Sequence, residues 1–492
     1  MSNGPTFVIA GDPNAGKSTL VACLAENDQV RIDRKAGTTR VAKPYHAMVG
    51  GKSVLTLIDL PGFENPAYLK QWFDEHTDEP KKLVNRFVDE HRDQPRFKAE
   101  CEILRSLDGA AVIFVCDASR RCEQKDRDQA EILRLCTDKR LAVINLKSDV
   151  QGSTLADWKE MLGNQFTYHL FNPSRADFKD RIELLEKISH VIPGWRESMK
   201  NTITIFERDW NELRIPTAAD RLCDLIESTI KLRRTVFIGS DDGCKVKAAS
   251  RVKQELQNAI NEESDKFRLY IRQVFGHTKA DWNLPGLDLN EKDIFSEEVW
   301  KKFGLTKKQL VGVCTAIGAG FGGLIDFFLG GASFLLGTMV GGVIGGSIGL
   351  YAASRNSAIK VRLIRNSLFQ KLIGGLTLVP EAKHCFEARA SPFSNLPFII
   401  LDLSLPFIRA AARWSHGCPT VPDQGCRDEQ KLGMSSRWKS EDQMAVARWV
   451  GALASGKPRD IQKHEGKARL FLAEQVRLVI SERDLTEADS PC

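Results

Sequence analysis

The amino-acid sequence predicts an α/β protein: a doubly wound, mostly parallel sheet followed by a mainly α-helical region that contains a glycine-rich hydrophobic hairpin. Residues 1–200 alternate short apolar runs with amphipathic stretches, which is typical of strand–helix units around a parallel sheet. Residues 201–298 instead carry apolar side chains at helical spacing. Residues 309–353 hold 13 glycines and one charged side chain, Asp326.

Five apolar runs in the N-terminal part are expected to be strands, and they lie at residues 7–10, 54–58, 110–115, 141–144 and 166–171. Beyond them, Ala218, Leu222 and Ile226 recur at the spacing of one helix face. Residues 396–412 form a further apolar run, which we interpret as a core helix or strand. We therefore expect four units, at residues 1–200 (α/β domain), 201–300 (helical region), 301–355 (glycine-rich hairpin) and 356–492 (mainly helical domain).

Composition excludes a disordered chain or a disulfide scaffold, since 42% of the 492 residues are hydrophobic and 27% are charged. The twelve cysteines include no C-x-x-C pair, and the N-terminus lacks the features of a signal peptide. We therefore expect reduced thiols in a protein that faces the cytoplasm. His416, Cys418 and Cys426 are the nearest approach to a metal-binding pattern, but three ligands do not complete a tetrahedral site, and we interpret this segment as a loop.

A phosphate-binding loop follows the first predicted strand, because residues 11–18 read G-D-P-N-A-G-K-S and match G-x-x-x-x-G-K-[ST]. Its glycines allow backbone N–H groups to turn toward phosphates, at the positive end of the following helix. Lys17 is expected to reach the β and γ phosphates, and the Ser18 hydroxyl to bind Mg²⁺. Further nucleotide contacts are expected from Gly11, Asp12, Asn14, Ala15, Gly16 and Thr19.

Two shorter motifs follow at suitable distances. The sequence G-T-T-R at residues 37–40 places Thr39 where it can close over the metal ion. The sequence D-L-P-G at residues 59–62 places Asp59 at a strand end near the Mg²⁺, and the N–H of Gly62 near a γ-phosphate. Loops that are ordered by nucleotide and metal, and released on hydrolysis, are a general switch mechanism.

With these motifs, residues 5–190 resemble the Era, TrmE and EngA branch of small GTPases. The resemblance implies GTP as the nucleotide, slow intrinsic hydrolysis and a possible homodimer through the G domain. Phe63 stands where Ras-like proteins keep the glutamine that orients water, and an apolar side chain cannot do so. Asn14 matches an asparagine that recruits K⁺ in the resembled branch, so K⁺ stimulation is a hypothesis.

The base-reading motif departs from the N-K-x-D of this branch, because the chain reads Asn145-Leu146-Lys147-Ser148-Asp149. An alignment on Asp149 puts Leu146 in place of the asparagine, whereas an alignment on Asn145 inserts one residue. We expect Lys147 and Asp149 to bind guanine. The last motif of the branch is expected near residues 172–174.

An insertion of 47 residues separates Gly62 from the fourth predicted strand. The insertion and residues 206–226 are similar to those of a bacterial group that joins an Era-like GTPase domain to a C-terminal domain of unknown function with a glycine-rich hydrophobic segment. Because the insertion adjoins the second switch, it is either a reporter of the nucleotide state or a structural addition.

The glycine-rich stretch is expected to associate with membrane lipid. Residues 327–353 contain no charge and are long enough to cross a bilayer as a helix, and Gly337, Gly341 and Gly345 recur on one helix face. Residues 299–380 carry nine basic side chains against one acidic, and these basic residues flank the stretch. A buried helical pair in a soluble domain is the alternative.

We therefore predict a GTP-hydrolysing switch protein at the cytoplasmic face of a membrane, expected to be the bacterial inner membrane, with GTP and Mg²⁺ as ligands. Two alternatives are a GTPase of RNA or ribosome assembly and a nucleotide-driven membrane-remodelling protein. Nucleic acid is disfavoured as a partner, because residues 1–200 carry 30 basic and 30 acidic side chains. The sequence identifies no protein effector.

Overall fold

The structure is a computed structural model of the chain. The structure describes residues 4–30, 32, 41–77, 79–108, 110–147, 151–163, 165–238, 244–278, 299, 302–306, 308–310, 313, 359–365, 384–390, 395–418 and 433–482. Thr39, Asp149, Cys426 and nearly all of the glycine-rich stretch lie outside these residues, so the predictions made for them stay predictions.

The N-terminal part is built on a six-stranded sheet in the order β2-β3-β1-β4-β5-β6. Neighbouring strands run parallel, except that β2 and β3 are antiparallel. The strands are β1 (Thr6–Gly11), β2 (Lys43–Val49), β3 (Lys52–Asp59), β4 (Ala111–Asp117), β5 (Arg140–Asn145) and β6 (Tyr168–Phe171). Each of the five predicted strands is present. Strand β2 was not predicted, because this edge strand is largely exposed and lacks an apolar run.

Side chains of β1 alternate between two cores, as the pleat of a strand requires. Phe7 and Ile9 lie in one core, and Val8 and Ala10 lie in the other. The first core is covered by α1 (Lys17–Ala25), α7 (Phe178–Val191) and α8 (Arg196–Arg208). The second is covered by α5 (Gln124–Cys136), α6 (Gly152–Gly163) and the insertion. A sheet covered on both faces confirms the predicted α/β class.

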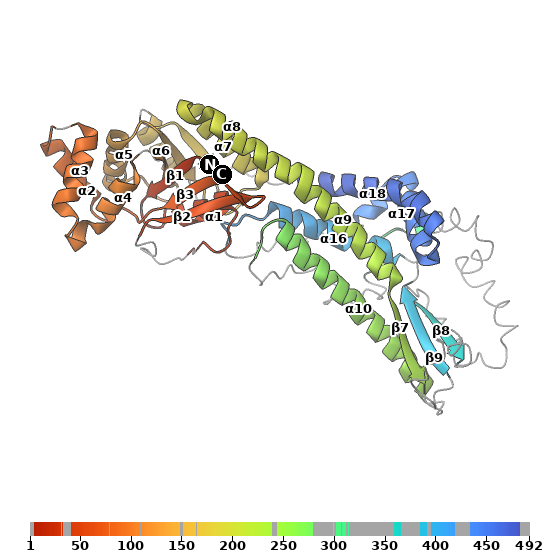
Figure 1. The fold of residues 1–492 in the computed structure, drawn as a ribbon. Coiled ribbons are helices and arrows are strands. Elements are labelled where there is room, and N and C mark those ends of the chain that lie inside the picture. Colours follow the sequence, from red (N-terminus) through yellow and green to blue (C-terminus); the bar gives the residue numbers. More distant parts are fainter. Residues whose placement is uncertain are drawn as a thin grey trace.

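The insertion after β3 consists of α2 (Pro66–Glu75), α3 (Pro80–His91), the short 3₁₀ turn η1 (Pro95–Phe97) and α4 (Lys98–Ser106). Its interior is aromatic: Trp72, Phe87 and Phe97 are buried, and their rings lie within about 6 Å of one another or of His91. The insertion forms the end of the molecule that lies farthest from the C-terminal helices (Figure 1).

A long helical rod leads out of the sheet domain. After the turn η2 (Pro193–Trp195), α8 continues through a π-helical turn, η3 (Asp209–Arg214), into α9 (Ile215–Lys231) (Figure 1). The predicted domain boundary at residue 200 falls inside α8. Helices α16 (Leu396–Arg413), α17 (Ser440–Ser455) and α18 (Pro458–Ser481), together with the turn η5 (Met434–Arg437), share one core with α9 and α10 (Cys244–Val274). The apolar run at 396–412 is therefore a core helix, one of the two options that its sequence left open.

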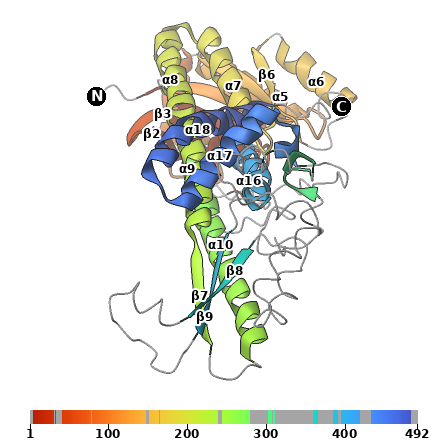
Figure 2. The ribbon, with the colours of Figure 1, turned by 90° about the vertical axis from the view of Figure 1, so that its right-hand side faces the viewer.

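A small antiparallel sheet, in the order β7-β9-β8, was not predicted. It pairs β7 (Arg233–Ile238), which precedes the glycine-rich stretch, with β9 (His384–Ala390) and β8 (Ile359–Arg365), which follow it. The sheet lies beside α10, at the end of the molecule away from the six-stranded sheet (Figure 2). Lys360, Arg362 and Arg365 of the basic flank are on β8. In the part of the chain that the structure describes, no helix combines the length and the apolar character that a membrane crossing needs.

Candidate nucleotide-binding site

The phosphate loop links the carboxyl end of β1 to the start of α1. Gly11 and Gly16 have φ angles of 143° and 102°, in the region that favours glycine. A Cβ atom on Gly11 would lie 2.5 Å from the carbonyl oxygen of Val115, and one on Gly16 would lie 2.3 Å from Nδ2 of Asn145. Both glycines are therefore needed for the loop to pass this close to its neighbours.

Lys17 lies buried at the mouth of this loop. Its Nζ donates to the carbonyl oxygens of Gly11 at 3.1 Å and of Asp12 at 3.0 Å. Burial lowers the pKa of Lys17 to about 8, although the carboxylates of Asp59 and Asp12 act in the opposite direction. The ammonium group thus stands in the loop with carbonyl partners that a phosphate could replace.

Ser18 and Asp59 form a pair of oxygen ligands. The Ser18 hydroxyl donates to Oδ2 of Asp59 at 2.7 Å. Asp59 is the last residue of β3, which runs parallel to β1, so both residues lie at the same edge of the sheet. Hydroxyl and carboxylate oxygens suit Mg²⁺, and these residues therefore fit the metal that the motifs imply. Thr39, the third predicted ligand, lies outside the described residues.

Gly62 contacts the phosphate loop directly. A Cβ atom on Gly62 would lie 2.5 Å from Cδ of Pro13, so a larger residue would push the loop away. The next residue, Phe63, is only 3% exposed and belongs to the core that includes the insertion. Its side chain is therefore used for packing, in agreement with the expectation that it cannot orient water.

Two residues of the base-reading segment hold the phosphate loop. The buried Asn145 donates from Nδ2 to the carbonyl oxygen of Ala15 at 2.9 Å. Lys147 donates from Nζ to the carbonyl oxygen of Asn14 at 2.8 Å and to Oδ2 of Asp117 at 2.5 Å. Asn145 therefore lies against the loop, which favours the alignment with one inserted residue. Asp149 lies outside the described residues.

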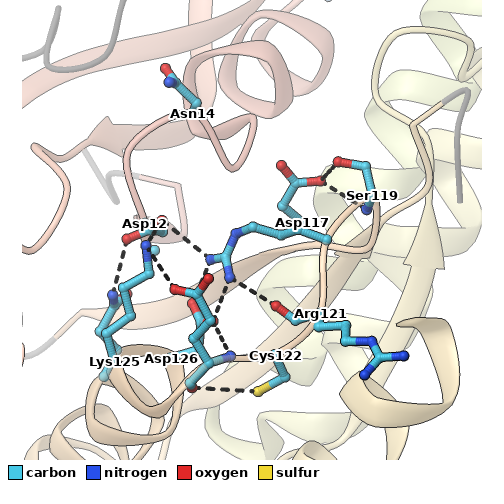
Figure 3. Close-up of polar contacts among 12 residues, drawn as sticks. Asp12, Asn14, Asp117, Ser119, Arg121, Cys122, Lys125 and Asp126 are labelled. Atoms are coloured by element: carbon cyan, nitrogen blue, oxygen red, sulfur yellow. Dashed lines mark hydrogen bonds and ion pairs between the residues drawn. The ribbon is translucent and has the colours of Figure 1, made fainter. Parts of the chain in front are cut away.

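Asp117, the carboxylate that pairs with Lys147, is held in its charged form. Burial raises the pKa of Asp117, but hydrogen bonds from Lys147 and Ser119 outweigh this and leave the pKa below its usual value. Ser119 donates to Oδ1 of Asp117 through both its hydroxyl, at 2.6 Å, and its backbone N–H, at 3.0 Å (Figure 3).

The side chain of Asp12 faces α5 rather than the interior of the loop. Its Oδ2 lies 3.0 Å from Nζ of Lys125 and 3.2 Å from a guanidinium nitrogen of Arg120, which also forms a bidentate pair with the buried Asp126 (Figure 3). Sequence reasoning missed this network, because the loop motif specifies only backbone geometry at this position. The side chain of Asp12 thus anchors the loop to this network, and the nucleotide contact expected of Asp12 stays a prediction.

A cavity of about 800 Å³ opens between the phosphate loop and the insertion. Pro13, Asn14 and Phe63 line one side, and Tyr68 and Arg96 of the insertion line another. The insertion therefore borders the edge of the loop where the predicted γ-phosphate position lies.

Helix α4 of the insertion holds the backbone beside both candidate switches. Oε1 of the buried Glu100 accepts the N–H groups of Glu64 at 2.8 Å and of Asn65 at 2.5 Å, directly after the D-L-P-G motif. Oε1 of Glu102 accepts the N–H of Ala42, two residues after the G-T-T-R motif, at 3.1 Å. Glu100 and Glu102 are two residues apart on α4 and fasten two separate segments.

The C-terminal region contacts the opposite side of the site. The hydroxyl of Ser415 donates to the carbonyl oxygen of Pro173, within the predicted last base-binding motif. A Cβ atom on Gly417 would lie 2.5 Å from that same oxygen and 2.8 Å from the carbonyl oxygen of Thr19. Thr19, which directly follows the phosphate loop, thus lies with its backbone against the C-terminal region.

A buried ion-pair group strengthens this contact. Glu26, at the end of α1, lies 2.5 Å from Arg181 of α7 and 2.5 Å from Arg214 of the π-helical turn. Burial raises the pKa of Glu26, but the two guanidinium groups outweigh it and hold the pKa well below the usual range. The rod is therefore fastened to the sheet domain by a carboxylate that stays charged.

Comparisons with known proteins agree with the motifs. The family model described as "Domain of unknown function (DUF3482)" matches residues 160–474, and the one described as "50S ribosome-binding GTPase" matches residues 6–146. The tRNA modification GTPase MnmE of Pseudothermotoga lettingae is 30% identical over 161 residues, which are 33% of this chain and 29% of that protein. MnmE of Lactobacillus helveticus is 31% identical over 166 residues, 33% of this chain and 30% of that protein.

Among solved structures, Era of Aquifex aeolicus matches with 16% identity and a TM-score of 0.28, over 56% of this chain and 90% of that one. The chain spans less than a third of the length of the two MnmE relatives.

Proposed function

Because the chain belongs to the family described as "Domain of unknown function (DUF3482)" and carries a P-loop GTPase domain of the Era/TrmE type, we propose that it is a nucleotide-driven switch at a membrane. GTP binding and hydrolysis, with Mg²⁺, are properties of the GTPase domain. We propose roles for single residues of the site. We also propose how the nucleotide state is transmitted through the protein and that the protein acts at a membrane.

The observation that carries the proposal is the pair of carboxyl groups on α4. Glu100 and Glu102 accept backbone N–H groups beside the second and the first candidate switch, respectively. A change in either switch on GTP hydrolysis would break or move these hydrogen bonds, and α4 would respond. This supports the reporter role of the insertion over a merely structural one.

Separate residues of the site would bind the phosphates, the metal ion and the base. The loop amides and Lys17 hold the phosphates, and Gly62 offers its N–H to the γ-phosphate. Ser18, Thr39 and Asp59 hold Mg²⁺, which when bound neutralises charge on the phosphates. Lys147 and Asp149 bind guanine. Hydrolysis of the β–γ bond then depends on position and charge rather than on a covalent intermediate.

Asn14 would hold K⁺ and so raise the rate of hydrolysis. Its φ of 65° places it in the left-handed region at the rim of the cavity, beside the buried Phe63, which leaves the site without a water-orienting glutamine at that position. We expect faster GTP turnover in KCl than in NaCl at equal ionic strength, and an Asn14→Ala variant that loses the difference. Equal turnover of the wild-type protein in the two salts would exclude K⁺ stimulation.

Residues 309–353 would bring the protein to the cytoplasmic face of the membrane. Three features of the sequence support this: a long run of uncharged residues, glycines at a spacing of four residues, and basic residues on either side. We expect the full chain to float with liposomes that contain anionic lipid, and a chain that lacks residues 309–353 to stay in the soluble fraction. A full-length protein that stays soluble with GTP and with GDP would contradict the membrane role.

A role in RNA or ribosome processes is the second candidate, because the matching family model is described as a ribosome-binding GTPase and the MnmE relatives as tRNA modification GTPases. The balanced charge of residues 1–200 speaks against it, since RNA-binding surfaces are basic. Membrane remodelling, the third candidate, would show as oligomers that form only with lipid and GTP. A homodimer through the G domain rests on the resemblance to the Era branch.

A further inference from the structure

We propose that Asp28, His277 and His416 bind one divalent transition-metal ion of the Zn²⁺ class. The three residues come from different parts of the chain: Asp28 follows α1, His277 follows α10, and His416 follows α16. The ion would therefore fasten the GTPase domain to the C-terminal helical region. This inference does not depend on the proposed switch or on membrane binding.

The three side chains converge in a buried position. One potential ligand atom from each lies within 4.8 Å of those of the other two. The exposed fractions of the three residues are 8%, 4% and 6%. The imidazole rings of His277 and His416 stack, with centroids 4.3 Å apart. A cluster of this kind is distinct from exposed acidic groups that meet by chance on a surface.

Hydrogen bonds with the surrounding backbone orient the donor atoms toward one point. Nε2 of His277 lies 2.9 Å from the carbonyl oxygen of Ala411, and because a carbonyl only accepts, this nitrogen carries the proton. In the neutral ring, Nδ1 then presents its lone pair, 3.7 Å from Oδ1 of Asp28. Nδ1 of His416 donates to the same oxygen at 2.6 Å, because a carboxylate only accepts, and a metal ion would bind there in place of this proton.

The carboxylate is oriented in the same way. Oδ2 of Asp28 accepts the N–H of Thr278 at 2.8 Å, which leaves Oδ1 toward the two imidazoles. A ligand histidine whose second nitrogen donates to a backbone carbonyl, as His277 does to Ala411, is the usual arrangement around protein-bound metals. The outer contacts expected of a metal site are thus in place at two of the three ligands.

Charge and ligand chemistry indicate the class of ion. The Asp28 carboxylate accepts a hydrogen bond from Nδ1 of His416, and a bound divalent cation would take the place of that proton. Two imidazoles and one carboxylate suit Zn²⁺ and related ions, whereas Mg²⁺ and Ca²⁺ prefer oxygen ligands alone. Three protein ligands leave a coordination position for water or for a further side chain.

This site revises the metal pattern noted in the sequence. His416 was grouped there with Cys418 and Cys426 and interpreted as part of a loop, but the structure brings it together with Asp28 and His277, which lie far away in sequence. Beside it, Gly417 packs so closely that an added Cβ atom would lie within 2.8 Å of the carbonyl oxygens of Pro173 and Thr19. The ion would therefore brace the segment that rests against the nucleotide-binding side of the sheet.

The test is metal binding by the full-length protein, freed of metal by chelator and dialysis. We expect one equivalent of Zn²⁺ by elemental analysis, and one equivalent of Co²⁺ that gives a visible absorption spectrum of mixed nitrogen and oxygen ligation. Asp28→Asn and His416→Gln should each weaken binding at least tenfold. His464→Gln, on α18, is the matched control and should bind as the wild-type protein does.

A wild-type protein that takes up neither ion at one equivalent would overturn the proposal, even if the variants were less stable. Binding of Co²⁺ that is unchanged in both variants would overturn it as well. Circular dichroism and GTP binding show whether each variant is folded. If a variant is not folded, the number and type of ligands from X-ray absorption of the Zn²⁺-loaded wild-type protein decide the question: a site without two imidazoles contradicts the proposal.

Discussion

At the residue scale, Lys17 links the sequence motif to a measurable property of the site. Its ammonium group is buried and bonded to two carbonyl oxygens of its own loop, and its pKa is lowered to about 8. A bound phosphate favours the charged form of the lysine and so raises this pKa. Nucleotide binding and proton uptake at Lys17 are therefore linked.

We predict that GDP binding at pH 8 takes up about half a proton, since about half of the Lys17 side chains are neutral at a pH equal to their pKa. As the pH rises from 7 to 9, the nucleotide-free protein loses this proton and the affinity falls. Calorimetric titrations in two buffers with different ionisation enthalpies measure the uptake. Equal binding enthalpies in both buffers at pH 8 would contradict the linkage.

Single residues were predictable where a motif fixes the local backbone. The loop from Gly11 to Ser18 and its partner Asp59 are placed as expected, because strand, glycines and helix follow one another within a few residues. Two alignments of Asn145 with the N-K-x-D motif were left open, because one inserted residue separates Asn145 from Lys147. The partners of Asp12 were also missed, since they lie more than 100 residues away and depend on how α5 packs.

At the scale of elements, α4 is the structural link between the insertion and the switches. Glu100 is fully buried, and its Oε1 is the acceptor for two neighbouring N–H groups. Removal of this acceptor leaves two donors in a poorly hydrated place, which costs about 1–3 kcal/mol for each donor that finds no other partner.

We predict that Glu100→Ala lowers the free energy of unfolding by about 1–3 kcal/mol and weakens the response of the insertion to nucleotide. Glu100→Gln retains an acceptor oxygen and should lose much less. Urea unfolding, followed in both variants, measures the difference. Glu90→Gln is a surface control, because Glu90 pairs with Arg86 on its own helix. Equal stability of the Ala and Gln variants at position 100 would show that the hydrogen bonds do not matter.

Elements with a strong local pattern were predicted, and those set by distant pairing were not. The buried parallel strands have short apolar runs, and α16 has a longer one that is interrupted at Asp402 and Pro406. Strands β7 and β8 are rich in basic residues, and β7 pairs with β9 across the glycine-rich stretch, so nothing nearby in the sequence indicates a sheet. Pairing over such separations depends on tertiary structure rather than on local propensity.

At the scale of the whole molecule, the GTPase sheet lies between two sets of contacts. On one side, α4 fastens the segments beside both candidate switches. On the other side, the rod from α8 to α9 and the segment around Ser415 are fastened through Glu26, Pro173 and Thr19. A nucleotide-driven change in the sheet domain could therefore reach both the insertion and the C-terminal helices.

The sequence divided the chain into four successive units, whereas the structure joins parts that are distant in sequence. Helix α9 shares its core with α16, α17 and α18, and β7 pairs across the glycine-rich stretch. The GTPase fold was predictable because its motifs lie close together in the sequence, within residues 11–62. The C-terminal architecture was not, because its core is assembled from segments on both sides of residues 309–353.

Hydrogen exchange of the full-length protein, compared between Mg²⁺ with a non-hydrolysable GTP analogue and Mg²⁺ with GDP, tests the switch most directly. We predict different exchange at the amides of Glu64 and Asn65 and along α4 in the two states, in addition to changes in the phosphate loop. Phosphate-loop amides that are protected by both nucleotides, with identical exchange in α4 and at Glu64 and Asn65, would contradict the proposal that the insertion reports the nucleotide state.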